Sequence, residues 1–494
     1  MLFNSFQFLI FFPIVVLIYY LLPVKVRKIW LLITSYYFYM CWDAKYALLI
    51  LTSTVITYFS GIVLNKIQEQ KYETEKEKKY KKAVVFLSFA SNLGILIFFK
   101  YFEWILENLS IVTKLDFSFP FSIVLPVGIS FYTFQALSYT MDVYRGEITA
   151  EKNFIKYALF VSFFPQLVAG PIERSKNLLS QLDCEKKFQY DNAKSGLLLM
   201  PWGFFEKIVI ADKAAIFVDN VYNNCSERYG SVIILATILF AIQIYCDFGG
   251  YSHIAIGAAR VLNVQLMDNF RQPYMALTIH DFWNRWHISL SSWFKDYLYI
   301  PLGGNRRGRL RKYLNLFITF FVSGLWHGAS WHFVVWGVLH GIYQIVSDAM
   351  RSVSQKMQNV IRIKRDCFSY RLLQRGITFG LVTFAWLFFR ANNLGDALLM
   401  VKKMITELHP SGIVAESIWN NGLDQTQAVT LFIAILVLLI VDWIHEKGIS
   451  ITAFLNQQNL VFRWGVYYIT ILFIVISFIQ TFGTSAGAFI YFQF

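Results

Sequence analysis

Two histidines stand in one of the most apolar stretches of the chain, SGLWHGASWHF at residues 323–333. They are His327 and His332, and each directly follows a tryptophan. A third histidine, His287, occurs in HDFWNRWHISLSSWFKDYL at residues 280–298. Because an ionisable side chain at bilayer depth is costly, these histidines are candidates for function.

The chemistry that such histidines suit is proton transfer. Burial without a counter-charge favours the neutral imidazole, which accepts a proton. A base placed on a hydroxyl group accelerates its attack on a thioester carbonyl by about 10²–10⁴-fold. A basic entrance would also attract a phosphorylated donor such as a coenzyme A derivative. The pattern favours a membrane-embedded transfer enzyme, and hydrogen-bonded packing is the alternative for each histidine.

For three histidines, hydrogen-bonded packing is a better interpretation than catalysis. We therefore expect His280, His332 and His340 to be packing residues. His327 and His332 form an H-x4-H pair, which raises a metal site as a further hypothesis. Membrane di-iron sites of this kind also need clusters with paired histidines, and the chain contains no His-His dipeptide. We therefore expect no metal site.

The elements that position these residues are transmembrane helices. The chain of 494 residues is 56% hydrophobic and 15% charged, whereas soluble domains carry about 25% charged residues. Apolar runs of about 20 residues recur and could cross a bilayer core of about 30 Å. The sequence predicts a polytopic membrane protein with helices near 6–22, 29–41, 46–64, 84–99, 120–141, 156–171, 194–210, 231–247, 314–326, 331–349, 375–391, 427–443 and 463–483.

The charged loops predict the orientation of these helices. The first helix lacks the features of a signal peptide, so we expect it to be retained in the membrane. The basic segments 24–28 and 66–82 are expected in the cytoplasm, with the N-terminus on the other side. The net charge of +14 is explained by this topology, so we expect no nucleic acid partner. The five cysteines include no CxxC pair, which argues against a disulfide framework.

The basic loops 306–312 and 351–375 are also expected in the cytoplasm, so residues 313–349 must enter the membrane and return. Each pass would be short, and the 14 positions from 313 to 326 reach roughly 20 Å. This predicts a re-entrant hairpin with His327 at its turn. Gly324 and Gly328 would allow close backbone approach or end the helix there, and Trp326 would pack at the turn.

The segment 280–298 predicts one amphipathic helix near the cytoplasmic surface, because its apolar residues recur at helical spacing. His287 lies in the apolar stripe and is expected to point into the protein. Upstream, Asp247 in QIYCDFGGYSH is expected to end an apolar helix before a Gly-Gly break.

Several of these motifs together resemble a known family, the membrane-bound O-acyltransferases, in particular the alginate O-acetyltransferase type. The resemblance extends in order over nearly the whole chain and departs from the usual motifs at Asn284, Lys295 and Ser323. It rests on PVGISFYTFQALSYTMDVYRG (126–146), FFPQLVAGPIER (163–174), YCDFGGYSHIAIGAARVL (245–262), NFRQPYMALTIHDFWNRWHISLSSWFKDYLYIPLGGNR (269–306), SGLWHGASWHFVVWGVLHG (323–341) and FIYFQF (489–494).

The resemblance implies an all-α polytopic membrane protein, a single acyltransferase domain over residues 1–494. Its fold would be a ring of about 11–13 transmembrane and re-entrant helices around a histidine funnel. The catalytic histidine of the family maps to His327 and the second essential one to His287. Asp247 and Arg285 are expected to help shape the site.

The implied activity is O-acetylation of an exported or cell-surface polysaccharide, by a multi-pass protein of the cell membrane. The donor would be cytoplasmic acetyl-CoA, with no bound cofactor, and the acetyl group would pass to an extracytoplasmic acetyltransferase partner. One alternative is D-alanyl transfer to teichoic acids from a carrier protein, against which IPLGGNR and the long segment after 350 argue. The other is a polysaccharide transporter, against which the lack of internal symmetry argues.

Overall fold

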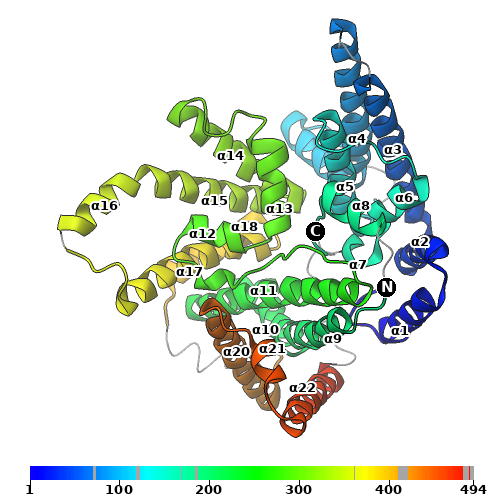
Figure 1. Cartoon of the computed structure of the whole chain (residues 1–494). Coiled ribbons are helices and arrows are strands. Elements are labelled where there is room, and N and C mark those ends of the chain that lie inside the picture. The colour runs from blue at the N-terminus through cyan, green and yellow to red at the C-terminus, as the bar shows by residue number, and fades with distance from the viewer. Residues whose placement is uncertain are drawn as a thin grey trace. The chain divides into compact units, whose positions relative to one another are not determined.

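The structure is a computed structural model that describes residues 1–69, 74–117, 123–168, 170–183, 187–360, 362–409, 421–481 and 489. Every regular element in these residues is a helix (Figure 1). The helices are labelled as in Figure 1, together with short 3₁₀ or π-helical turns labelled η.

Six of the described helices are long and apolar enough to cross a membrane. They are α3 (Ala47–Gln68, extended to Ala44 by the turn η1), α4 (Glu75–Thr113), α11 (Gly230–Val261), α17 (Phe368–Arg390), α20 (Gln425–Glu446) and α22 (Leu460–Thr481). The prediction of an all-α polytopic membrane protein is thus confirmed.

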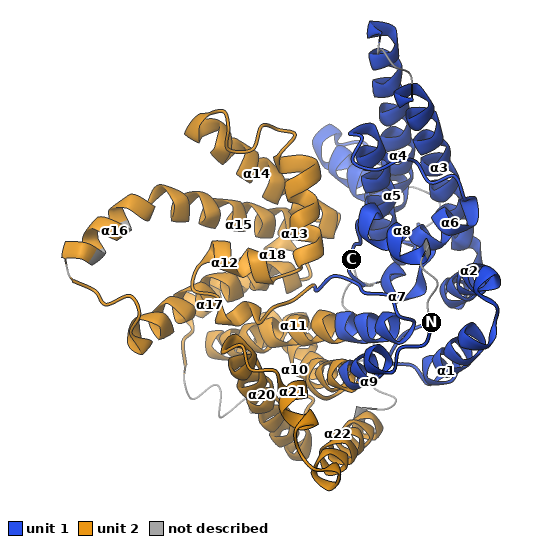
Figure 2. Ribbon diagram, in the orientation of Figure 1, with its two compact units in different colours: residues 1–200, 251–268 blue, residues 201–250, 269–494 orange. Residues whose placement is uncertain are grey.

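The contacts divide the chain into two compact units, coloured in Figure 2. Unit 1 holds residues 1–200 and 251–268, and unit 2 holds residues 201–250 and 269–494. The helices α9 (Tyr190–Phe204) and α11 contribute residues to both units. The prediction of one acyltransferase domain over the whole chain stays a prediction.

Unit 1 is built from apolar helices joined by buried polar contacts. The hydroxyl of Ser53 on α3 donates to the side-chain oxygen of Asn92 on α4 at 2.5 Å. A Cβ atom at Gly61 would lie 2.6 Å from the ring of Tyr139, so glycine allows α3 and α5 to pack closely. The remaining helices of this unit are α1 (Phe6–Leu21), α2 (Val24–Met40), α5 (Ile129–Tyr144), α6 (Phe154–Ser162), α7 (Phe164–Leu167) and α8 (Ser175–Asp183).

Unit 2 begins with a helix that changes its hydrogen-bonding period. After α9 the chain forms a π-helical segment, η2 (Phe205–Ala211), and continues as α10 (Asp212–Asn223). The N–H of Asp212 donates to the C=O of Lys207, five residues earlier. The other elements of unit 2 include the 3₁₀ turns η3 (Cys225–Glu227) and η4 (Pro273–Met275), α12 (Ile279–Arg285), α13 (Ile288–Phe294), the π-helical η5 (Lys295–Tyr299), α14 (Gly308–His327), α15 (Trp331–Ala349), α16 (Arg351–Val360), α18 (Leu394–Thr406) and α21 (Ile451–Asn456).

Two predicted helix boundaries are wrong for identifiable reasons. The predicted helix 156–171 is split into α6 and α7 at Phe163, because Pro165 has no N–H to continue an α-helix. The helix predicted to end at Asp247 continues through Gly249 and Gly250 to Val261. A Cβ atom at Gly250 would lie 2.6 Å from the C=O of Gly203, so this glycine serves close helix packing rather than a break.

Parts of several predicted segments lie outside the described residues. These are residues 70–73 of the loop 66–82, residues 120–122 of the helix 120–141, residue 169 of the helix 156–171, residue 361 of the loop 351–375, residues 482–483 of the helix 463–483, Cys184, and the terminal FIYFQF motif except Phe489.

Candidate active site

A hairpin of two helices is present around His327, as α14 and α15, which pack side by side. That this hairpin enters the membrane and returns stays a prediction. His327 is the last residue of α14, and at 1.5 Å per residue it lies about 29 Å along the helix from Gly308, where α14 begins inside the predicted loop 306–312. Neither helix on its own is one of the six candidate spans.

The glycines of the hairpin allow its helices to touch. A Cβ atom at Gly324 would lie 2.4 Å from the backbone oxygen of Phe333, and one at Gly337 would lie 2.3 Å from that of Phe320. A Cβ atom at Gly328 would lie 2.2 Å from the Phe333 ring. A larger residue at Gly324 would push the backbones of α14 and α15 apart, and one at Gly328 would displace the Phe333 ring or the segment that carries His327.

The imidazole of His327 is buried among aromatic rings, with 5% of the residue exposed. Its ring centroid lies 5.0 Å from that of Trp326, 4.9 Å from that of Trp336 and 5.1 Å from that of Phe389. These rings come from α14, α15 and α17, so the packing of three helices fixes the position of the imidazole.

The single amphipathic helix predicted over 280–298 is wrong, because the chain breaks at His287 into α12 and α13. His287 has a left-handed backbone with φ of 41°, a conformation that interrupts any α-helix. The expected burial is confirmed, since His287 is 1% exposed. Its ring lies 4.5 Å from that of Phe248 on α11.

The two predicted histidines lie in one aromatic cluster of unit 2, and Trp326 contacts both. The Trp326 ring is 6.3 Å from that of His287 and 5.0 Å from that of His327, measured between centroids. The structure thus brings His287, His327, Trp326, Gly324 and Gly328 together, and their roles in catalysis stay predictions.

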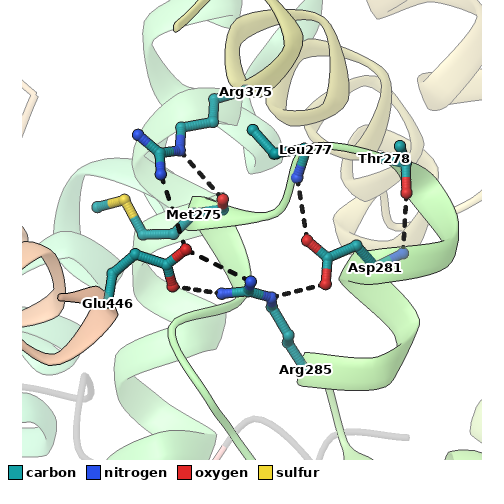
Figure 3. Close-up of polar contacts among 7 residues, drawn as sticks. All are labelled: Met275, Leu277, Thr278, Asp281, Arg285, Arg375 and Glu446. Atoms are coloured by element: carbon teal, nitrogen blue, oxygen red, sulfur yellow. Dashed lines mark hydrogen bonds and ion pairs between the residues drawn. The ribbon is translucent and has the colours of Figure 1, made fainter. Parts of the chain in front are cut away.

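Arg285 lies at the end of α12, two residues before His287, and is held by acidic groups (Figure 3). Its guanidinium donates to Asp281 at 2.8 Å and to Glu446 at 2.6 Å. Figure 3 shows the Glu446 carboxylate between the guanidinium groups of Arg285 and Arg375. Arg285 therefore ties the segment before His287 to α20, and Glu446 in turn contacts Arg375 of α17.

Asp247 has a different environment from the one expected, because it lies in the middle of α11. The Lys207 ammonium is 2.6 Å from Asp247 and 2.8 Å from Asp212. All three side chains are at most 7% exposed. Since Phe248 is the next residue, Asp247 helps to fix the part of α11 that packs against His287.

Sequence reasoning missed Asn269, which is 1% exposed and contacts the turn at His287. Its C=O accepts the N–H of Ile288 at 3.0 Å, and its side-chain oxygen accepts the hydroxyl of Ser289 at 2.6 Å. The sequence signal for it is an asparagine at the start of the run 269–306, which carries part of the family resemblance.

The three histidines that were expected to be packing residues have environments that differ from those of the pair. His332 is hydrogen-bonded through Nδ1 to the C=O of Phe388 at 3.0 Å. His340 accepts a hydrogen bond at Nδ1 from the indole N–H of Trp283 at 3.3 Å. His280 is exposed on α12. These contacts agree with packing roles for His332 and His340, whereas the packing role expected for His280 is wrong because its side chain is exposed.

The part of the chain that forms this site is similar to known proteins. A family model described as MBOAT, membrane-bound O-acyltransferase family, matches residues 37–391, which include both histidines. The peptidoglycan O-acetyltransferase of Helicobacter pylori is 34% identical over an alignment of 537 residues, covering 100% of this chain and 98% of the relative. The probable alginate O-acetylase of Pseudomonas aeruginosa is 37% identical over 408 residues, 82% of this chain and 74% of the relative.

A more distant relative carries a different acyl group in its name. The teichoic acid D-alanyltransferase of Bacillus subtilis is 26% identical over 243 residues, which cover 45% of this chain and 59% of the relative. The relatives all transfer acyl groups, so the protein is an O-acyltransferase, and its helices make it a multi-pass protein of the cell membrane. The resemblance found in the sequence is therefore confirmed: the chain belongs to the membrane-bound O-acyltransferase family.

Proposed function

We propose that this protein takes an acetyl group from cytoplasmic acetyl-CoA and delivers it for O-acetylation of an exported or cell-surface polysaccharide. The observation that carries the proposal is the pair of buried imidazoles, His287 and His327, which both contact the Trp326 ring. The relatives that cover most of the chain are named for O-acetylation of peptidoglycan and of alginate, which supports an acetyl group and a carbohydrate polymer.

The reaction assigns a separate role to each histidine. His327 accepts the proton of the acceptor hydroxyl while its oxygen forms a bond to the thioester carbonyl carbon. The N–H of a neutral His287 donates to the carbonyl oxygen, on which negative charge develops. The C–S bond then breaks, and the thiolate takes the proton from His327. The products are the acetyl ester and coenzyme A.

The donor choice is supported by the basic loop before α14. Arg306, Arg307 and Arg309 are exposed at the start of the helix that leads to His327. Exposed arginines bind phosphate groups in a bidentate manner and raise the local concentration of an anionic donor. A carrier protein would be the donor in D-alanyl transfer. Transfer from acetyl-CoA by the purified protein with no carrier protein present would separate the two.

The acetyl group is expected to pass to an extracytoplasmic acetyltransferase partner, which modifies the polymer. Pulse labelling with the acetyl group of acetyl-CoA should then place label on a second protein before it reaches the polysaccharide. Label that reaches the polymer with no protein-bound stage would instead indicate direct transfer.

The experiment that tests the proposal measures ester-linked acetate on peptidoglycan and on other exported polysaccharides. Cells should carry the native protein, His327→Ala or His280→Ala at equal membrane abundance, where His280→Ala is the control because His280 is exposed. We expect acetate to vanish from one polymer with His327→Ala alone. Unchanged acetate with His327→Ala would mean that His327 packs rather than reacts, or that the acyl group is not acetyl.

A further inference from the structure

We propose that Asn269 is a positioning residue that holds the His287 imidazole in place for acyl transfer. The inference rests on the proposed function, because it assigns Asn269 to the reaction in which His287 takes part. Asn269 lies in the segment before α12 and is buried in unit 2.

The backbone at His287 needs support from outside its own turn. With φ of 41° and ψ of 56°, it occupies the left-handed region, which residues with a Cβ atom adopt at a cost in free energy. An ordinary residue at the start of a helix has an extended backbone and caps the helix with its side chain. His287 does neither, so its conformation persists only where surrounding contacts impose it.

Asn269 and its neighbour Arg271 supply such contacts on both sides of His287. After the histidine, the N–H of Ile288 donates to the C=O of Asn269 at 3.0 Å. Before it, the C=O of Arg285 accepts the N–H of Arg271 at 3.0 Å. The two backbone bonds join the segment 269–271 to both arms of the turn, and His287 lies between them.

The Asn269 side chain adds the contact that a substitution can remove. The hydroxyl of Ser289, which is fully buried, donates to the side-chain oxygen of Asn269 at 2.6 Å. This bond joins the first turn of α13 to the segment 269–271. Its loss would leave the turn held by the two backbone bonds alone, which would loosen the position of the imidazole against Phe248 and Trp326.

The test compares Asn269→Ala with a matched variant, Asn92→Ala. In unit 1 the hydroxyl of Ser53 donates to the side-chain oxygen of Asn92 at 2.5 Å, so both substitutions delete a buried Ser–Asn hydrogen bond. Steady-state transfer by the purified protein should show kcat reduced about 10²-fold for Asn269→Ala with KM within twofold. Asn92→Ala should leave kcat nearly unchanged although its unfolding temperature falls by a similar amount.

A double substitution tests whether Asn269 acts through His287. In a His287→Ala background, Asn269→Ala should lower kcat no further, because no imidazole remains to be positioned. If Asn269→Ala lowers kcat by the same factor in both backgrounds, or if Asn92→Ala lowers kcat equally, the inference is overturned.

The same data separate failure of the inference from failure of the proposed function. Absence of acetyl transfer from acetyl-CoA by the native protein would refute the proposed donor. Native activity in His287→Ala would refute the role proposed for His287, and the positioning role with it. A loss in His287→Ala together with full activity in Asn269→Ala would refute the inference alone and leave the function standing.

Discussion

The ammonium of Lys207 lies 2.6 Å from the carboxylate of Asp247, and neither side chain is more than 3% exposed. Lys207 belongs to the π-helical segment η2 and Asp247 to the middle of α11, so the pair joins two elements of unit 2. The same ammonium also contacts Asp212. Because charges buried this deeply depend on each other, removal of one partner leaves the others uncompensated.

We therefore expect Asp247→Ala to destabilise the protein by about 3–5 kcal/mol, because it leaves a buried ammonium without one of its partners. Thermal unfolding in detergent and the amount of protein in the membrane would measure the effect. Asp348→Ala is the control, since its pair with Lys312 is partly exposed and contributes at most about 1 kcal/mol. Normal stability with lost transfer activity would instead assign Asp247 a direct role in catalysis.

Gly324→Ala should separate the two helices of the hairpin and strongly reduce activity. The added methyl group would meet the backbone oxygen of Phe333 at 2.4 Å, and overpacking of this kind costs about 1–3 kcal/mol. Gly376→Ala on α17 has open space around the new methyl group and should be neutral or slightly stabilising. Equal activity of the two variants would show that the close approach at Gly324 is not needed.

Arg285→Lys should lower activity about tenfold while the amount of folded protein stays the same. Lysine keeps the positive charge but lacks the planar group that contacts Asp281 and Glu446 together. Loss of one charged hydrogen bond corresponds to about 1.5–3 kcal/mol. Arg371→Lys, in an exposed pair with Asp366, is the matched control and should behave like the native protein. Full activity of Arg285→Lys would show that charge alone suffices.

Glu173 should make the stability of the protein depend on pH. It lies between α7 and α8, outside the six candidate spans, and burial raises its pKa from 4.5 to about 7 although the N–H of Met267 donates to it. The folded protein thus holds a proton that the unfolded chain releases between these pH values. Stability should therefore fall as pH rises from about 4.5 to 7, by about 3 kcal/mol for this group.

The variant Glu173→Gln should remove this contribution and raise the unfolding temperature at pH 8 relative to the native protein. At pH 4 the two proteins should unfold at similar temperatures, because Glu173 is protonated in both states. Glu227→Gln, which changes an exposed glutamate, should show no such difference. An unfolding temperature of Glu173→Gln below the native value at pH 8 would contradict the argument.

Hydrophobic periodicity and charge predicted the helical fold and the hairpin well, because both follow from local sequence. Because basic segments lie on both sides of residues 313–349, the chain had to turn near the middle of this range. Gly324 and Gly328 indicated that the turn lies near His327. The break at His287 could not be predicted in this way, since its apolar stripe is continuous and the contacts that impose the turn come from Asn269, 18 positions earlier. The ion pair of Asp247 could not be predicted from local sequence either, because its partner Lys207 lies 40 positions away.

The π-helical segment η2 decides which side of its helix Asp212 occupies. In an uninterrupted α-helix, positions five apart are rotated by about 140° around the axis, so Lys207 and Asp212 would face different neighbours. The wider turn brings them onto one side, where their charged groups meet at 2.8 Å. One residue fewer between 205 and 211 would restore the α-helical period and turn every later side chain of α10 relative to α9. The length of η2 is therefore as constrained as its composition. A deletion in η2 would misalign the whole of α10, whereas a surface loop could accommodate a deletion of the same size.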